Sequence, residues 1–331
     1  MQEHDVVGIG NAIVDIIGRC DDAFLDRHGR IKGSMQLVDA ATVTSLYAAM
    51  GPGVEISGGS VANTAVGVAS FGGKAGFIGK VADDEFGRIF AHDIRTAGVT
   101  FATPAAAKGG EPTARSLILV TPDGQRTMNT FLGVSPQLGG GEVDAELIAS
   151  ARIVYLEGYL FDRPEAKAAF RRAASIAAKA GRQVALSLSD PFCVDRHRAD
   201  FRDLVRNAVD ILFANEAEAL SLYQTGNFED AARQVQAETR LAALTRSEKG
   251  SVILGGGKSV VIPAVPIAEV VDTTGAGDLY AAGFLYGIAT GRDLETAGRL
   301  GSLAAAEIIS HVGARPAVSL RELARAKGLS S

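Results

Sequence analysis

Cysteine is scarce in this sequence, which has only Cys20 and Cys193 in 331 residues. Two cysteines cannot build the disulfide framework that stabilises many secreted proteins, so we expect both to be free thiols in a reducing compartment. Neither lies in a His/Cys cluster with the spacing of a zinc site. The sequence therefore predicts no structural metal.

Basic blocks and long apolar runs are also absent. The net charge is −5, which argues against broad nucleic-acid binding, although helix N-termini can still bind a small phosphate-bearing ligand. Apolar stretches are interrupted before about 18 residues, the length of a membrane helix, and the N-terminus lacks the pattern of a signal peptide. We therefore expect a cytoplasmic protein without a membrane segment.

Short β-branched runs alternate with longer Ala-rich amphipathic runs along most of the chain. Because strands that alternate with helices form βαβ units, we expect an α/β fold with a mostly parallel, doubly covered sheet. The predicted strands are 5–10, 75–81, 152–158, 183–189, 210–215 and 241–245, the predicted helices are 60–72, 83–98 and 163–181, and a hairpin is predicted over 251–264.

Two regions depart from this alternation. Residues 11–45 contain strand-like pieces with little helix between them, and residues 113–133 read as a hairpin around a Pro-Asp-Gly turn. Both lack partners in an α/β sheet, so we expect them to form a small β lid on a single domain, 1–331. The run 264–271, "AVPIAEVV", also has a strand-like pattern.

The segment "DTTGAGD" (272–278) lies at the start of a predicted helix. Gly275, Ala276 and Gly277 can present backbone N–H groups there, where the helix dipole favours the negative charge of a phosphoryl group. Asp278 can take a proton from an attacking hydroxyl. Alternatively, the segment is a glycine-containing loop with an Asp as the helix N-cap. It is not a P-loop, because the Gly-Lys-Ser/Thr ending is missing.

A second cluster, residues 57–87, includes Gly58 and Gly59 before a helix whose predicted N-cap is Ser60. The glycines let a ligand approach the backbone, and Asn63 can donate to and accept from a diol. The alternative is a structural strand–helix junction with Asn63 as an ordinary surface residue.

Together the two segments resemble the paired signatures of the ribokinase-like family, also called phosphofructokinase-B-type carbohydrate kinases. The match consists of "GGSVANTA", "FGG" and "GFIGKVADDEFG" early in the chain and "DTTGAGDLYAAGF" late in it. The resemblance covers nearly the whole chain and implies a three-layer, doubly wound sheet with a β lid. It also implies ATP-dependent phosphorylation of an alcohol, with Asp278 as base and Gly275–Gly277 as the anion hole.

The resemblance places further residues at the nucleotide. "NEAE" is similar to the family's Asn-x-x-Glu motif, which implies that Asn215 and Glu218 lie near Mg²⁺ and the phosphates, Glu218 through water. From the residues alone, a helix N-cap with acids in its first turn is the simpler interpretation. "TRSEKG" resembles the segment that lines the ATP site and brings Thr245, Ser247 and Gly250 there. Many members have Gly in place of Ser247.

Asp272 and Thr274, with the loop 310–316, resemble the monovalent-cation region of several members, which implies the use of K⁺. At the first strand, the family's Asp that grips substrate hydroxyls corresponds to Asp15, with Asn11 beside it. The alternative for Asp15 is an exposed acid on an edge strand.

The segments "GNAIVDI", "GSMQLVD" and "VDILFANEAEA" resemble the adenosine kinases of this family more than the ribokinases. This resemblance implies phosphorylation of the adenosine 5′-hydroxyl and a role in purine salvage. Leu37, Phe131 and Tyr159 are the candidates for an apolar base slot, or else core residues. Arg126 resembles the lid arginine that approaches the transferred phosphate, or else is a solvated hairpin residue.

Other functions remain to be separated by experiment. One is a kinase of the same fold that acts on a free sugar, and another is a catalytically silent binding protein. A Rossmann dehydrogenase is excluded because Ile13 occupies the place of the third glycine after the first strand. We expect a monomer or a homodimer.

Overall fold

The structure is a computed structural model that describes residues 3–329. In these residues a nine-stranded sheet has the order β14-β13-β12-β11-β10-β9-β1-β5-β6. All neighbours are parallel except the β12/β13 and β13/β14 pairs. The strands are β1 (His4–Ile9), β5 (Ala75–Ile78), β6 (Val99–Phe101), β9 (Ala151–Glu157), β10 (Gln183–Ser187), β11 (Ile211–Asn215), β12 (Leu241–Thr245), β13 (Ser251–Gly255) and β14 (Lys258–Ile262). The predicted α/β class and parallel sheet are confirmed.

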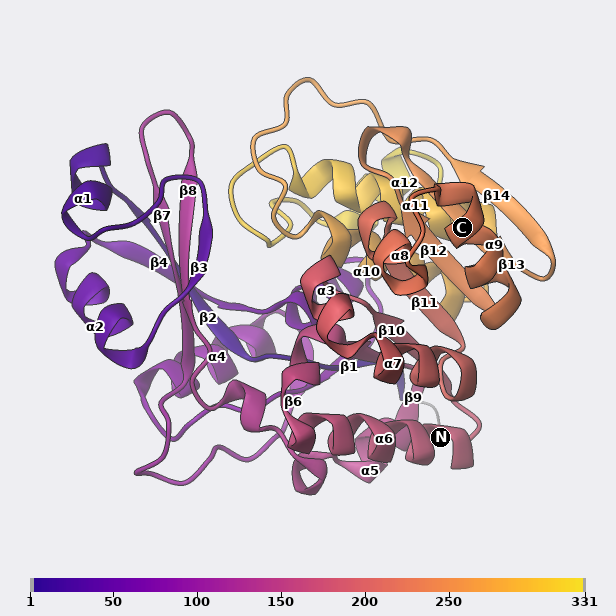
Figure 1. Ribbon diagram of the computed structural model, residues 1–331, viewed down its shortest axis with the longest axis horizontal. Helices are drawn as coiled ribbons and strands as arrows, with labels where there is room; N and C mark the ends of the chain where they lie inside the picture. Colours follow the sequence, from indigo (N-terminus) through magenta and orange to yellow (C-terminus); the bar gives the residue numbers. More distant parts are fainter. Residues whose placement is uncertain (1–2, 330–331) are drawn as a thin grey trace.

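Helices cover both faces of this sheet, because its central strands are apolar on both sides (Figure 1). In β9, Ile153 and Tyr155 belong to one core, whereas Val154 and Leu156 belong to the other. The first core includes α3 (Ser60–Ser70), α4 (Glu85–Thr96), α10 (Ala276–Ala289), α11 (Leu294–Ile308) and α12 (Leu320–Ala326). The second includes α5 (Ala145–Ser150), α6 (Pro164–Lys179), α7 (Pro191–Asn207), α8 (Glu216–Tyr223) and α9 (Phe228–Glu238).

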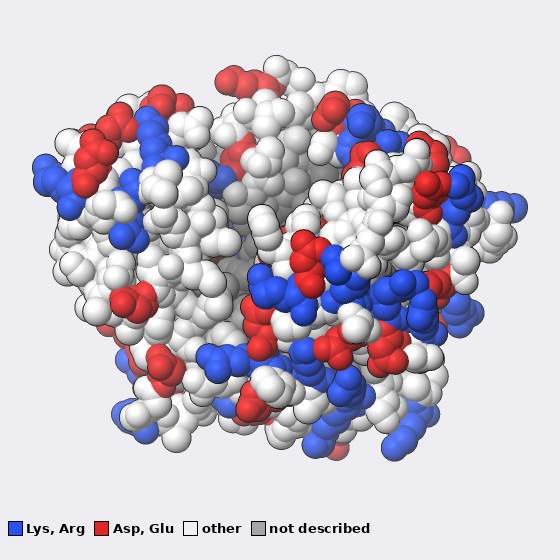
Figure 2. All heavy atoms as spheres, viewed as in Figure 1, with Lys and Arg blue, Asp and Glu red and all other residues white. Residues whose placement is uncertain are grey.

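A second sheet of five strands, in the order β3-β8-β7-β2-β4, stands to one side of the larger sheet (Figure 1). We call it the lid sheet. Its back face packs on two helices, α1 (Asp22–Arg27) and α2 (Ala40–Ala49). Its strands are β2 (Ile13–Arg19), β3 (Met35–Leu37), β4 (Gly53–Gly58), β7 (Ala114–Val120) and β8 (Arg126–Phe131). Figure 2 shows the surface hollowed between the lid sheet and the larger body.

The strand-like pieces expected in residues 11–45 form β2 and β3, with only the six-residue α1 between them. Three other local predictions were wrong. The lid sheet also includes β4, which lies outside the two expected segments. The run 264–271 forms no strand, because Pro266 within it and Pro263 before it cannot donate to a ladder. Ser60 is not the N-cap of α3; Gly59 holds that position with φ 101°, and the Ser60 hydroxyl bonds elsewhere.

Candidate active site

Asp278 lies in the first turn of α10, where the start of α3 meets it. The Ser60 hydroxyl donates to Oδ1 of Asp278 (2.6 Å), and Nδ2 of Asn63 donates to Oδ2 (3.0 Å). Thr64 adds a bond from its hydroxyl to the Asp278 carbonyl oxygen (3.0 Å). Burial raises the pKa of Asp278, and the Ser60 and Asn63 bonds oppose this shift. The carboxylate is therefore oriented by two donors and held close to the start of α3.

The Asn63 side chain is buried, at 5% exposure, and is not the surface residue of the simpler interpretation. Its Oδ1 is buried and has no hydrogen-bond partner in residues 3–329. Buried acceptors are nearly always paired in native proteins, so an unpaired one beside a carboxylate indicates a donor supplied from outside. A hydroxyl group of a bound alcohol has this chemistry.

The glycines of the DTTGAGD segment open the backbone at the start of α10. Gly275 is the N-cap with φ 79°, and a Cβ there would lie 3.0 Å from Cβ of Ala314. A Cβ on Gly277 would meet no atom within 4 Å, so open space adjoins the first turn of the helix. The Ala276 N–H donates to the Thr273 carbonyl oxygen (3.2 Å). The arrangement suits an anion near Gly277, and the role of all three residues stays a prediction.

Asp15 points from β2 of the lid sheet onto the Gly58 backbone. A Cβ on Gly58 would lie 2.2 Å from Oδ2 of Asp15, and a Cβ on Gly59 would lie 2.1 Å from the Asn11 carbonyl oxygen. Only glycine allows these approaches. Asp15 is 9% exposed, and burial raises its pKa to about 7, opposed by the charges of Arg315 and Arg126. It is therefore not the exposed edge-strand acid of the simpler interpretation.

Glu157, at the end of β9, is a site residue that the sequence analysis missed. Its Oε1 accepts from the backbone N–H of Asn11 (3.2 Å) and from Nδ2 of Asn11 (2.6 Å). Its Oε2 accepts from the N–H of Val61 (3.0 Å), and the Ser135 hydroxyl donates to Oδ1 of Asn11 (3.0 Å). Burial raises the pKa of Glu157 to about 7. A lone carboxylate in the apolar run "RIVYLEG" was the available signal.

The front face of the lid sheet, defined as the face that carries Asp15, has two rows of side chains given by the strand register. The row of Asp15 continues through Ser116 and Thr130 to Leu37, with a hydroxyl–hydroxyl bond of 2.8 Å between Ser116 and Thr130. The neighbouring row, two positions away on each strand, is apolar. It consists of Val54, Ile17, Ile118, Met128 and Met35.

This register corrects one predicted residue of the base slot. Phe131 pairs with Arg115, one position from the Thr130–Ser116 pair, so its side chain lies on the back face with the core. Leu37 is on the front face and is 64% exposed. Tyr159 belongs to the larger body just after β9, is 40% exposed, and donates its N–H to the Ser189 hydroxyl (3.1 Å).

Arg126 also lies on the front face of the lid sheet and reaches the DTTGAGD segment. Its Nη2 donates to Oδ1 of Asp272 and to the Thr274 hydroxyl (2.5 Å). Asp272 also accepts from the N–H groups of Thr274 (2.7 Å) and Gly313 (2.9 Å). Nη1 of Arg126 is buried without a partner in residues 3–329. Arg126 is thus not a solvated hairpin residue; its contact with a phosphate and the cation role of Asp272 and Thr274 stay predictions.

On the nucleotide side, Asn215 and Glu218 form a capping box at the start of α8. Asn215 donates its N–H (2.9 Å) and Nδ2 (2.7 Å) to the Glu218 carboxylate, and Glu218 donates its N–H to Oδ1 of Asn215 (2.8 Å). The cap predicted from the residues alone is therefore present. Burial raises the pKa of Glu218 to about 7. Asn215 ends β11 and Glu218 follows it, at the edge of the sheet that also carries Glu157.

This donor set fits Mg²⁺, because carboxylate and amide oxygens are ligands that it prefers, directly or through water. No group of three or more His, Cys, Asp or Glu side chains in residues 3–329 could hold a metal ion alone. Phosphate oxygens and water would have to complete the coordination.

The segment 245–250 begins with the last residue of β12 and leads to β13. Ser247 adopts φ 51°, a conformation that glycine takes more readily, which accords with the Gly of many family members at this place. Gly250 has φ 81°, and a Cβ there would lie 2.0 Å from the Ile262 carbonyl oxygen. Thr245 pairs with Ser251 in the β12/β13 ladder. The segment is a tight turn whose contact with ATP stays a prediction.

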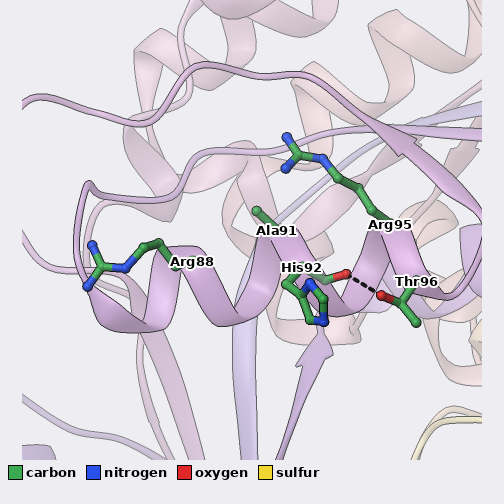
Figure 3. Close-up of a pocket in the computed structure, with 5 residues that line it drawn as sticks. All are labelled: Arg88, Ala91, His92, Arg95 and Thr96. Carbon is green, nitrogen blue, oxygen red and sulfur yellow. Dashed lines mark hydrogen bonds between the residues drawn. The ribbon is translucent and has the colours of Figure 1, made fainter.

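A surface pocket on α4 lies apart from these residues. Figure 3 shows its lining, in which the Thr96 hydroxyl donates to the His92 carbonyl oxygen (2.9 Å). None of the predicted substrate or nucleotide residues lines it. Among the described residues, no helix combines the length and apolar character needed to cross a membrane.

An alcohol held beside Asp278 would face the glycine-rich start of α10, an arrangement suited to phosphoryl transfer in a small-molecule kinase. Residues 48–320 match the family described as pfkB family carbohydrate kinase, so the chain belongs to this family of small-molecule kinases. The expectation from the two sequence signatures is thereby confirmed.

Similar proteins carry the names of both sugar and nucleoside kinases. A structure of a probable sugar kinase from Rhizobium etli CFN 42 is 52% identical, covers all of both chains and has a TM-score of 0.91. A structure of adenosine kinase from Sinorhizobium meliloti is 53% identical, covers 98% of this chain and 99% of its own, and has a TM-score of 0.89. An ATP-dependent ribose-1-phosphate kinase from Halopiger xanaduensis is 33% identical over 268 residues, 78% of this chain and 82% of its own.

Proposed function

We propose that this protein transfers the γ-phosphoryl group of ATP to the 5′-hydroxyl of adenosine, giving AMP and ADP in the cytoplasm. The observation that carries the kinase chemistry is the unpaired Oδ1 of Asn63 beside the carboxylate of Asp278. One group can accept a hydrogen bond from a substrate hydroxyl while the other accepts the proton of the attacking one.

The front face of the lid sheet supports a nucleoside as the acceptor. Its Asp15 row offers a carboxylate and two hydroxyls to a ribose, and the next row offers only apolar side chains. A purine has a flat apolar face to bury there, whereas a free sugar has hydroxyls on all sides that would lose water without gaining partners. The 53% identity to the Sinorhizobium meliloti adenosine kinase points the same way.

In the proposed mechanism Asp15 and Asn63 hold the ribose so that its 5′-hydroxyl points at Asp278. Asp278 takes the proton as the oxygen attacks the γ-phosphorus in line, and the bond to the β-phosphate oxygen breaks. The backbone of Gly275–Gly277 and the Arg126 guanidinium bear the charge of the transferred group. Mg²⁺, held by phosphate oxygens and by Glu218 and Asn215 through water, would neutralise charge on the phosphates.

A free sugar or sugar phosphate is the second candidate, favoured by the names of several relatives, including the ribose-1-phosphate kinase. A catalytically silent binding protein is the third.

A coupled ADP-release assay with Mg·ATP separates these candidates. The acceptors are adenosine, guanosine, inosine, ribose, fructose and ribose 1-phosphate. Turnover on adenosine with little on ribose supports the proposal. Turnover on a sugar or sugar phosphate alone rejects the nucleoside while keeping the kinase. Silence on all six, in a protein that binds adenosine by calorimetry, favours the silent binder.

A further inference from the structure

Arg315 lies in the loop after α11, and its guanidinium bonds to two segments far from it in the sequence. Nη1 donates to the Ala62 carbonyl oxygen (3.2 Å). Nη2 donates to the Ser57 hydroxyl (2.8 Å) and to the Ser57 carbonyl oxygen. The Arg315 guanidinium thus connects the end of β4, in the lid sheet, to the first turn of α3.

These anchors lie next to the catalytic candidates along the chain. Ser57 precedes Gly58, on which the Asp15 carboxylate packs, and Ala62 precedes Asn63, which donates to Asp278. The residue before Arg315, Ala314, is the one closest to a Cβ placed on Gly275. One loop therefore contacts the turn of the lid sheet, the start of α3 and the glycine-rich start of α10.

Arg315 makes no direct salt bridge with any residue in 3–329. Its donors go to carbonyl and hydroxyl oxygens instead. Asp93 of α4 accepts from the Ser57 N–H (2.7 Å) and hydroxyl (2.6 Å) and so approaches the same serine. Burial lowers the pKa of Arg315 to about 10, so the group is charged at neutral pH.

The negative charges of three carboxylates from different elements raise the pKa of Arg315 and so oppose the effect of burial. They are Asp93 of α4, Asp15 of β2 and Asp278 of α10. The charges of Arg315 and Arg126 lower the pKa of Asp15 and that of Asp278 raises it, whereas the bonds from Ser60 and Asn63 and the charge of Arg315 lower the pKa of Asp278. The charge of Asp278 in turn raises the pKa values of Glu157 and Tyr155 in β9. The positive charge of Arg315 lowers the pKa of both Asp15 and Asp278.

We propose that Arg315 is a positioning residue for phosphoryl transfer, whose charge stabilises the carboxylate forms of Asp278 and Asp15 and whose hydrogen bonds fix the turn between the lid sheet and α3. The inference rests on the proposed kinase function for its catalytic consequence. The stabilisation of the two carboxylates does not depend on which alcohol is the substrate.

The test compares Arg315→Gln, which removes the charge, with Arg315→Lys, which keeps it. Arg315→Met, which keeps the apolar stem, replaces the Gln variant if that variant does not fold. Arg321→Gln on α12 is the control, because its side chain lies against Gly72, away from the site. The first readout is the ¹³C NMR titration of the Asp278 side-chain carboxyl in the ligand-free protein, assigned with Asp278→Asn.

In the Gln or Met variant the apparent pKa of Asp278 is expected to rise by about one unit, whereas the Lys and Arg321 variants stay near the parent value. The second readout is the pH profile of kcat/KM on the best acceptor. The pKa of the acidic limb of this profile should rise with the pKa of Asp278 measured by NMR. Below the shifted pKa, kcat/KM should fall about tenfold relative to the parent protein, and at high pH it should recover.

Equal losses in the Gln and Lys variants at every pH, with no NMR shift, would overturn the proposal and leave Arg315 a purely structural clamp. If the parent protein turns over none of the acceptors, the proposed function fails while the NMR shift still decides the electrostatic role.

Discussion

Nδ2 of Asn63 donates a hydrogen bond to Oδ2 of Asp278 across 3.0 Å, although 215 positions separate the two residues. The bond joins the first turns of α3 and α10, so the two sequence signatures meet as one site. It also occupies one carboxylate oxygen with a donor, which favours the ionised form that a base needs.

Replacing Asp278 by Asn should remove the base without removing the donors around it. We expect kcat to fall by about 10³-fold, because general base catalysis contributes that order, while the acceptor still binds. Turnover and calorimetric titration with adenosine measure the two quantities. Glu295→Gln, an exposed acid in the first turn of α11, is the control. Near-normal kcat in Asp278→Asn would reject the assignment of the base.

Asp15 should destabilise the fold at alkaline pH. Its folded-state pKa is raised to about 7, so the native state binds more protons than the unfolded chain between about pH 4 and 7, and stability is lost as pH rises through this window. Asp15→Asn should therefore raise Tm at pH 8 by about 5 °C and leave it nearly unchanged at low pH, near 3.5. Asp26→Asn, an exposed acid of α1, is the control. An equal change in Tm at both pH values would contradict the argument.

Arg126 fastens the lid sheet to Asp272 and Thr274. Arg126→Gln should lower kcat by about 10²-fold, because it removes a charge from the transferred group, and should speed proteolysis of the β7–β8 hairpin. Steady-state kinetics and limited chymotrypsin digestion, which cleaves after the Leu, Met and Phe residues of the hairpin and does not need Arg126, measure the two effects. Arg88→Gln, on the exposed pocket of α4, is the matched control (Figure 3). Unchanged kcat together with unchanged digestion would show that Arg126 has neither role.

Leu37 ends the Asp15 row two positions from Met35 of the apolar row, so it should border the base of a nucleoside and help to select it. Leu37→Asn should raise the KM for adenosine about tenfold, since burying an unpaired amide against a purine costs roughly 1–2 kcal/mol, and should change the KM for ribose little. Ile31→Asn is the control, because Ile31 is equally exposed at 64% but lies outside the two rows. An equal rise for both acceptors would place Leu37 away from the base.

The sequence was sufficient for eight of the nine strands of the larger sheet, because their periodicity is a local property, but not for the three-residue edge strand β6. Strand β4 was not predicted because Pro52, Gly53 and Glu55 interrupt its apolar pattern. The face of Phe131 depends on the register of the lid sheet, which no single strand specifies.

Glu157 and Arg315 were missed for a different reason. Glu157 bonds to residues 146 and 96 positions away, and Arg315 to residues 253 and 258 positions away. A lone Glu at a strand end and a lone Arg in a loop have no periodicity, so only the folded chain reveals their partners.

The alternation of faces in β8 also restricts how this protein can evolve. Arg126, Met128 and Thr130 share the front face, and a single inserted or deleted residue among them would turn part of that set toward the core. Such a change would turn Arg126 away from the front face and bury its charge in the core, in a single mutation. We therefore expect descendants of this gene to vary β8 by substitution, and to change length in the exposed 121–125 turn instead.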